Sequence, residues 1–275
     1  MFYIEPNTAA ELGITLFEHN KRVTTLLKKL RYLLRHGILH VEIFGPGGVG
    51  KTTLGLILAE GTHPKRSTNK YQESIDVEGY WLQGDTVVAI HVPPGQERRR
   101  SSTWQDFYKR LAQGKSSGVI NVVSWGYHSF QEFSYQETKY YRKGMSETEF
   151  LANYAEQGRE EELTIIKDLV PRLCDAKEKL WMITLVTKQD LWWNERASVR
   201  QHYEQGEYHS YINKILEAKG SQNFSHEYLS ASLVLNNLTS GTGQLLAPTT
   251  AGYDQNIQAA NVEQFLKAIN SFAER

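Results

Sequence analysis

Short apolar runs alternate with longer amphipathic stretches along most of the chain. The apolar runs are rich in β-branched and aromatic residues and predict strands over residues 39–44, 74–82, 86–92, 118–125, 180–186 and 227–231. The stretches whose apolar residues recur at helical spacing predict helices over residues 8–36, 52–60, 147–179, 198–219 and 256–273. We expect interruptions at Pro171 in the third helix and at Gly206 in the fourth.

The order of these elements predicts the fold class. Strands that alternate with helices are typical of a parallel sheet covered by helices on both faces. Residues 83–85, Gln-Gly-Asp, separate the second strand from the third and are typical of a hairpin turn. We therefore expect an α/β protein with one antiparallel strand near an edge of a mostly parallel sheet.

Composition narrows the classes of function. The 275 residues contain 31 Lys plus Arg and 31 Asp plus Glu, and this zero balance argues against wholesale nucleic-acid binding, which needs a basic surface. The single cysteine, Cys174, excludes an intrachain disulfide framework and a cysteine-rich zinc site. Residues 180–186, the longest apolar run, fall well short of the ~20 residues that span a bilayer, and residues 1–13 lack the layout of a secretion signal. We therefore expect a cytoplasmic protein without nucleic-acid binding or direct membrane attachment.

Residues 45–52 read Gly-Pro-Gly-Gly-Val-Gly-Lys-Thr and match the phosphate-loop pattern G-x-x-x-x-G-K-[ST]. The loop lies between a predicted strand and a predicted helix. Its glycines let successive N–H groups turn inward around a phosphate, and the helix N-terminus adds its positive dipole end. We expect Lys51 to reach the β- and γ-phosphates and the Thr52 hydroxyl to bind Mg²⁺. The expected phosphate-binding residues here are Gly45, Gly47, Gly48, Val49, Gly50, Lys51, Thr52 and Thr53.

Two later strands run into short polar motifs. Residues 187–190, Thr-Lys-Gln-Asp, follow the strand at 180–186, and residues 230–232, Ser-Ala-Ser, follow the last strand. With the phosphate loop, and in this order and spacing, they resemble the N-K-x-D and S-A-[KLS] guanine-reading motifs of the Ras-like small GTPases. The resemblance covers about residues 39–125 and 161–273. It implies a P-loop NTPase three-layer sandwich with a mostly parallel sheet and one antiparallel hairpin strand, here with an added N-terminal helix.

The chemistry of these motifs agrees with a guanine site. The Asp190 carboxylate can accept the N1–H and the N2 amino hydrogens of guanine, whereas adenine offers no such pair and leaves a buried charge unpaired. The stem of Lys188 can lie along the face of the base. The Ala231 N–H can donate to guanine O6. The flanking Ser230 and Ser232 complete the second motif.

The family has Asn at the first position of the base motif, and this chain has Thr187. In the family, Asn ties the base loop to the phosphate loop. A threonine hydroxyl can do part of this with fewer hydrogen bonds. We expect guanine selectivity to survive with weaker affinity.

The resemblance also implies two switch segments. The family's D-x-x-G-Q corresponds here to Val92-Pro93-Pro94-Gly95-Gln96. Gly95 would donate its N–H to the γ-phosphate, and Gln96 would orient the attacking water, which makes Gln96 and Lys51 the candidate catalytic residues. Val92 occupies the position of the aspartate that normally holds Mg²⁺ through a water, so we expect weaker Mg²⁺ binding and slower hydrolysis.

A threonine before the hairpin should complete the first switch. Thr68 is the best placed, and with Thr52 it forms the predicted Mg²⁺ ligand pair. At residues 98–100 three arginines follow the second switch. They suit a solvated face, a partner-binding patch or an arginine supplied to the γ-phosphate, and the sequence leaves these readings open.

We expect an N-terminal helical extension over residues 1–38 and one Ras-like GTPase domain over residues 39–275, with an aromatic insert at about 126–160. The Arg98–Arg100 run, the insert and the N-terminal helix are the candidate contacts for an effector protein. A leucine stripe on that helix also fits simple packing against its own domain, and the aromatic residues of the insert also fit a local core.

The sequence therefore predicts a GTP-binding and GDP-binding switch that hydrolyses GTP slowly with Mg²⁺ and regulates an effector. Two alternatives remain at this point. One is a GTP-binding module with little or no hydrolysis. The other is a P-loop ATPase or small-molecule kinase.

Overall fold

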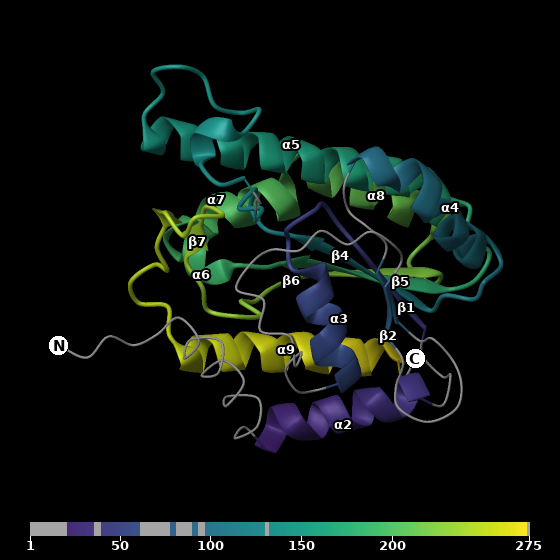
Figure 1. Cartoon of the computed structure of the whole chain (residues 1–275). Coiled ribbons are helices and arrows are strands. Elements are labelled where there is room, and N and C mark those ends of the chain that lie inside the picture. Colours follow the sequence, from purple (N-terminus) through teal and green to yellow (C-terminus); the bar gives the residue numbers. More distant parts are fainter. Residues whose placement is uncertain are drawn as a thin grey trace.

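The computed structural model describes residues 21–35, 40–60, 78–80, 90–92, 97–129 and 132–273. Within these residues, six strands form one sheet in the order β2-β3-β1-β4-β5-β6 (Figure 1). In the part of this sheet that the structure describes, β2 and β3 pair antiparallel, and the other neighbouring strands pair parallel. This confirms the predicted fold class. The strands are β1 (Val41–Phe44), β2 (Glu78–Tyr80), β3 (Ile90–Val92), β4 (Gly118–Val123), β5 (Leu180–Val186) and β6 (Phe224–Ser230).

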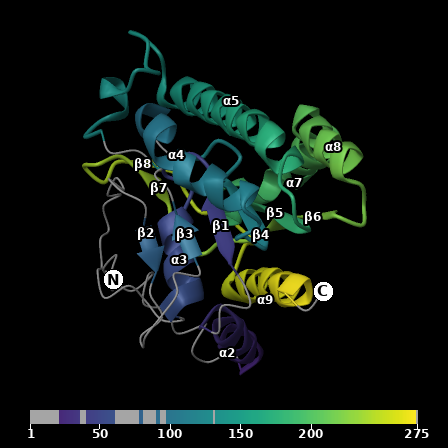
Figure 2. The same cartoon turned by 90° about the vertical axis from the view of Figure 1, so that its right-hand side faces the viewer.

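Helices cover both faces of the sheet, so the molecule has three layers (Figure 2). One face packs against α3 (Lys51–Glu60) and α9 (Gln255–Ala273), with α2 (Lys21–Arg35) outside them. The other face packs against α4 (Glu97–Ala112), α5 (Glu147–Cys174) and α8 (Glu207–Lys219). Shorter helical turns follow β5, namely α6 (Gln189–Trp192), η2 (Trp193–Glu195), α7 (Arg196–Arg200) and the π-turn η3 (Gln201–Gln205).

The central strand β5 shows why the sheet is buried on both faces. Every residue of β5 is buried. Alternate side chains point to opposite faces of a strand: Met182 packs into the core under α5 and α8, and Ile183 packs into the core under α9. The continuous apolar run in the sequence follows from this two-sided burial.

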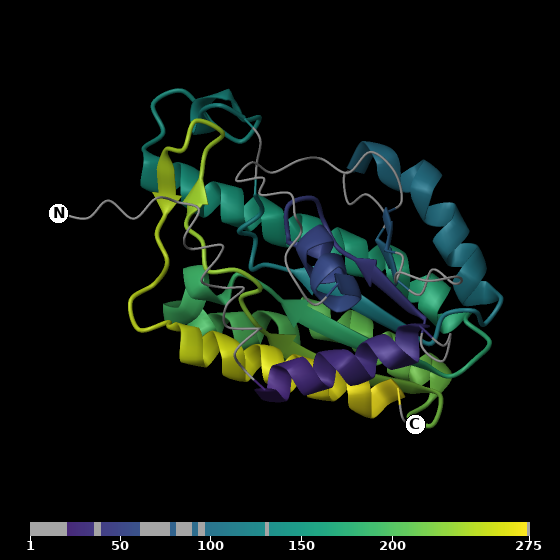
Figure 3. The same ribbon diagram turned by 60° about the horizontal axis from the view of Figure 1, so that its bottom comes forward.

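The N-terminal helix α2 packs on its own domain. Val23, Leu27 and Leu30 are buried in the core shared with α3 and α9, and Figure 3 shows α2 lying along α9. The apolar stripe predicted from the sequence is therefore a packing face. Residues 8–20 of the predicted helix lie outside the described residues.

Two helices differ from the sequence prediction. Helix α4 was not predicted, although Trp104, Phe107 and Leu111 recur at helical spacing and are all buried. Helix α5 runs on through Pro171 without the expected interruption. Because Pro171 lies in the last turn, it removes one hydrogen bond near an end that stops at Cys174. The expected break at Gly206 is confirmed, since η3 ends there and α8 begins.

The aromatic insert and the loop at residues 236–255 pack together. Phe150 and Tyr154, at the start of α5, form a small core with Leu238 and Leu246 of the hairpin β7 (Leu238–Thr239) and β8 (Leu245–Ala247). Partly buried Tyr135, Tyr140 and Tyr141 border this core. Most of the insert's aromatic side chains thus serve local packing, whereas Phe133 is 67% exposed.

Among the described helices, none combines the length and the apolar character needed to cross a bilayer.

Candidate functional site

The phosphate loop lies between β1 and α3, at the carboxyl edge of the sheet. Three of its glycines, Gly45, Gly48 and Gly50, have φ values of 133°, 74° and 96°. Side chains are strained at such angles, so the turn depends on glycine. The structure brings all the predicted phosphate-binding residues from Gly45 to Thr53 onto this turn and the first turn of α3.

Lys51 is folded back over the phosphate loop. Its side chain is buried, and Nζ donates a hydrogen bond of 2.5 Å to the Pro46 carbonyl oxygen. The ammonium group therefore lies against the phosphate loop, and it belongs to the first residue of α3. A cation there, beside the N–H groups of a helix N-terminus, suits an anionic ligand.

Thr187 joins the base motif to the phosphate loop, as predicted. Its buried Oγ1 lies 2.7 Å from the Val49 carbonyl oxygen and 2.9 Å from that of Val123, and its single hydroxyl hydrogen is shared between these two acceptors. Trp192 supports the same turn, because its Nε1 donates to the Thr187 carbonyl oxygen at 2.8 Å. The two halves of the candidate site are thus held together by a direct contact.

Asp190 follows β5 and is 1% exposed. The Ser232 hydroxyl donates to Asp190 Oδ1 at 2.5 Å, and the Asn236 N–H donates to Oδ2 at 3.2 Å. Burial raises the pKa of Asp190, and these donors partly oppose the rise. A carboxylate has about four acceptor positions, so the Ser232 and Asn236 donors do not use all of them.

Lys188 adopts a left-handed backbone conformation, with φ 54°. Its Nζ donates to the Tyr127 carbonyl oxygen at 2.6 Å and to Ser129 Oγ at 2.8 Å. Burial lowers the pKa of Lys188 to about 7, while Asp190 and Glu162 oppose the change. The ammonium group is therefore committed to the loop after β4, and the aliphatic stem is what remains for a base.

The second base motif needs a correction. The Ala231 N–H, expected to donate to guanine O6, donates instead to the Val186 carbonyl oxygen at 3.1 Å, because residue 231 continues the β5–β6 ladder. Ser230 Oγ accepts from Gln189 Nε2 at 3.0 Å. Ser232 is the serine that holds Asp190, so Ser230 and Ala231 act as supports of the motif.

The switch residues fall mostly outside the described part of the chain. Thr68, Gly95 and Gln96 belong to segments that the structure does not describe, so their assigned roles stay predictions. Val92 ends β3, and its side chain is buried in the core on the α3 and α9 side. Residues 98–100 lie in the first turn of α4, and their side chains are likewise outside the description.

The predicted Mg²⁺ ligands are only partly placed. Thr52 lies in the first turn of α3 with an exposed side chain, next to Lys51. Across the described ranges, no group of three or more His, Cys, Asp or Glu residues could hold a metal. Of the two predicted ligands, Thr52 is therefore placed beside the phosphate loop, and Thr68 lies outside the described residues. A threonine hydroxyl is an oxygen donor of the kind that Mg²⁺ accepts beside phosphate oxygens.

One set of site residues was not predicted. The turn at residues 124–129 follows β4 and carries Tyr127 and Ser129, which hold Lys188. Ser129 also donates its N–H to the Gly48 carbonyl oxygen at 3.0 Å. The one sequence signal for this turn is that it follows a predicted buried strand, whose end should lie beside the phosphate loop.

The sequence matches no protein-family model, and a search of curated proteins finds no match either. The structure resembles the signal recognition particle receptor protein SRb with GDP from Chaetomium thermophilum, at 16% identity over 85% of this chain and 96% of that one, with a TM-score of 0.40. The mammalian signal recognition particle receptor shares 12% identity over 85% of this chain and 99% of that one, with a TM-score of 0.44.

A third similar structure is the ADP-ribosylation-factor-like GTP-binding protein, or small COPII coat GTPase SAR1, of Encephalitozoon cuniculi in complex with GDP. It shares 10% identity over 98% of this chain and 95% of that one, with a TM-score of 0.35. The chain thus has structural similarity to small GTPases. At these identities and scores the similarity transfers no residue roles.

Proposed function

We propose that this protein is a GTP-binding switch that hydrolyses GTP slowly and regulates a partner protein. The observation that carries the proposal is the hydrogen bond from Thr187 to the Val49 carbonyl oxygen. It holds a phosphate-binding loop and a base-reading carboxylate in one rigid unit at the same edge of the sheet. In an open α/β sheet, this is the edge where ligands bind.

Asp190 supports guanine as the base. Its buried carboxylate already accepts from Ser232 and Asn236, and it has acceptor positions left for two further donors. Guanine presents an N1–H and an N2 amino group side by side, whereas adenine does not. With adenine bound, these remaining acceptor positions of a buried carboxylate would stay unpaired, which is costly, so adenine is disfavoured.

The test is Asp190→Asn, measured with fluorescent GDP, GTP, xanthosine triphosphate and ATP. We expect wild type to prefer GTP, and the variant to lose GTP and gain xanthosine triphosphate, because an amide can donate to the O2 of xanthine. Asp168→Asn, on the exposed face of α5, is the matched control and should behave as wild type. Tight ATP binding that is indifferent to Asp190→Asn would instead support a P-loop ATPase or kinase.

For hydrolysis, we propose that Gln96 orients the attacking water and that Lys51 stabilises charge on the transferred phosphoryl group. Mg²⁺, when bound with the nucleotide, would neutralise phosphate charge, with Thr52 as its protein ligand. Thr68 and Gly95 remain the proposed contacts of the γ-phosphate side. Because Val92 places an apolar side chain in the core where a carboxylate is expected, the reaction should be slow.

Val92 also favours the alternative of a GTP-binding module without useful hydrolysis. Single-turnover hydrolysis of GTP by wild type and Gln96→Leu separates the two. We expect wild type to be at least about tenfold faster, equivalent to about 1.4 kcal/mol of activation free energy. Equal rates would support the binding module.

A further inference from the structure

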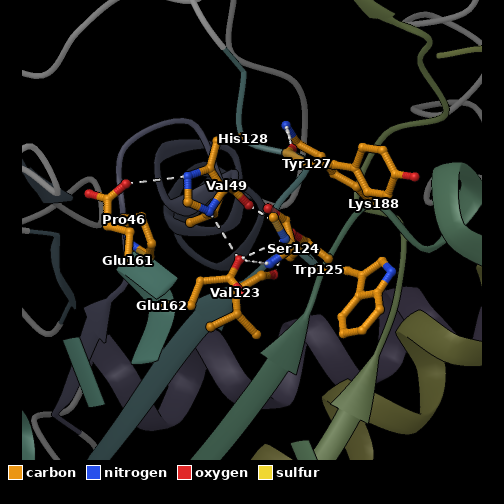
Figure 4. Close-up of polar contacts among 12 residues, drawn as sticks. Pro46, Val49, Val123, Ser124, Trp125, Tyr127, His128, Glu161, Glu162 and Lys188 are labelled. Carbon is orange, nitrogen blue, oxygen red and sulfur yellow. Dashed lines mark hydrogen bonds and ion pairs between the residues drawn. The ribbon is translucent and has the colours of Figure 1, made fainter. Parts of the chain in front are cut away.

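The turn at residues 124–129 rests on a buried carboxylate that the nucleotide site does not itself contain. Glu162, in the middle of α5, is 0% exposed. Figure 4 shows its carboxylate facing Ser124 and His128. Its Oε1 accepts from the Ser124 N–H at 2.8 Å, the Gly126 N–H at 3.2 Å and His128 Nε2 at 3.0 Å. Its Oε2 accepts from the Tyr203 hydroxyl at 2.5 Å. All four donors belong to the protein, and three of them come from the 124–129 turn, so this carboxylate organises the turn.

Helix α5 and the turn approach each other closely enough to exclude side chains. A Cβ on Gly126 would lie 1.9 Å from the Ala155 carbonyl oxygen, and a Cβ on Gly158 would lie 2.5 Å from the Gly126 carbonyl oxygen. Backbone therefore packs on backbone here, one helical turn from Glu162. The turn is seated on α5 by shape as well as by hydrogen bonds.

The far end of the turn touches both halves of the candidate site. Ser129 donates its N–H to the Gly48 carbonyl oxygen, and a Cβ on Gly48 would lie 2.4 Å from the Ser129 carbonyl oxygen. Tyr127 and Ser129 accept the hydrogen bonds of Lys188. A displacement of this turn would consequently move the phosphate loop and the base motif together.

We propose that Glu162 is a positioning residue for the nucleotide site, which it sets from α5 through the 124–129 turn and without contacting the ligand. The inference rests on the proposed function for its ligand, because it names how that site is held in shape. It also predicts that a displacement of α5 changes nucleotide binding through this carboxylate.

Charge strengthens the arrangement. His128 is buried, with Nε2 at 3.0 Å from Glu162 and Nδ1 at 3.5 Å from Glu161. Burial lowers the pKa of His128, but the hydrogen bonds and charges of Glu161 and Glu162 outweigh it and leave the pKa raised. Among the described residues, four other titratable groups interact with Glu162. Tyr203 of η3 donates to it, and its charge raises the pKa of Tyr208 of α8. The same charge favours the charged forms of Lys188 and His202. Hydrogen bonds between charged partners are stronger than neutral ones.

The test is Glu162→Gln, which keeps the shape and one acceptor oxygen and removes the charge. Glu160→Gln, on the exposed face of the same helix, is the matched control. In hydrogen–deuterium exchange without nucleotide, we expect faster exchange in Glu162→Gln at peptides covering 124–129 and 45–50, and unchanged exchange in the strand peptides of β5. In stopped flow, we expect release of fluorescent GDP about tenfold faster, equivalent to ~1.4 kcal/mol.

The two measurements separate this inference from the proposed function. If wild type binds no guanine nucleotide, the proposed function fails, and the exchange experiment still decides whether Glu162 sets the two loops. If wild type binds GDP while Glu162→Gln matches Glu160→Gln in exchange and release, the inference is overturned. Uniformly faster exchange over the whole chain would also overturn it, because Glu162 would then matter only for stability. Should Glu162→Gln fail to fold, Tyr203→Phe removes one donor to the same carboxylate and should give the same local pattern with about threefold faster release.

Discussion

At the scale of the residue, the buried pair His128–Glu162 gives the protein a characteristic pH response. Burial raises the pKa of Glu162, but His128, Tyr203 and the Ser124 N–H bring it below the ordinary value of 4.5, while the pKa of His128 lies above its ordinary 6.5. A lowered carboxyl pKa contributes stability above 4.5 that is lost as pH falls, and a raised histidine pKa contributes stability below 6.5 that is lost as pH rises. The pair should therefore stabilise the fold most between pH 4.5 and 6.5.

His128→Gln tests this response through urea unfolding at several pH values. We expect wild type to exceed the variant by about 3 kcal/mol near pH 5.5, the lower end for breaking a buried ion pair, and the gap to narrow steadily toward pH 9. Lys188, whose pKa is lowered to about 7, titrates in both proteins and largely cancels in the difference. Glu160→Gln should show a small gap that does not change with pH. A gap for His128→Gln that stays constant from pH 5.5 to 9 would contradict the assigned charges.

At the scale of the element, the local sequence pattern was enough to predict strands that are buried on both faces and helices that have one buried face. The run at residues 180–186 predicted β5 to the residue, and the glycine pattern predicted the turn before α3. Helix α4 was not predicted because its first turn is strongly charged, although Trp104 and Phe107 lie on its buried face. The contact that holds α4 to the sheet could not be predicted from the sequence either. Arg110 donates two hydrogen bonds, of 2.8 and 2.9 Å, to buried Glu42 of β1.

Contacts between distant elements account for the rest of what the sequence did not predict. Glu162 lies 38 positions from Ser124, and nothing in a helical pattern says which of its neighbouring glutamates turns inward. Likewise, Ser232 rather than Ser230 holds Asp190, because the β5–β6 register pairs Val186 with Ser230 and places the next residue in the ladder. The motifs predicted which kinds of side chain lie at this edge of the sheet. Tertiary packing decided which of two serines, Ser230 or Ser232, contacts Asp190.

At the scale of the whole molecule, residues 45–53, 124–129, 187–190 and 232–236 meet at one edge of the sheet although the chain separates them widely. Ligand that bridges these segments binds the folded state only, so it should stabilise the entire domain. At a concentration one hundred times Kd, the gain is about 2.7 kcal/mol, which for a chain of this length raises the melting temperature by about 6 °C.

Lys51→Ala puts that coupling to a direct test. Nζ of Lys51 lies on the phosphate loop, held by the Pro46 carbonyl oxygen, and removing it takes away the one cation that the structure places on that turn among the residues it describes. We expect GDP with Mg²⁺ to raise the melting temperature of wild type and of Lys167→Ala, a control on the exposed face of α5, while Lys51→Ala shows no shift. Circular dichroism melts with and without nucleotide measure it. A full shift in Lys51→Ala would contradict the assignment of the phosphate site. The nucleotide would then stabilise the domain without the Lys51 ammonium group, and its phosphates would have to bind elsewhere.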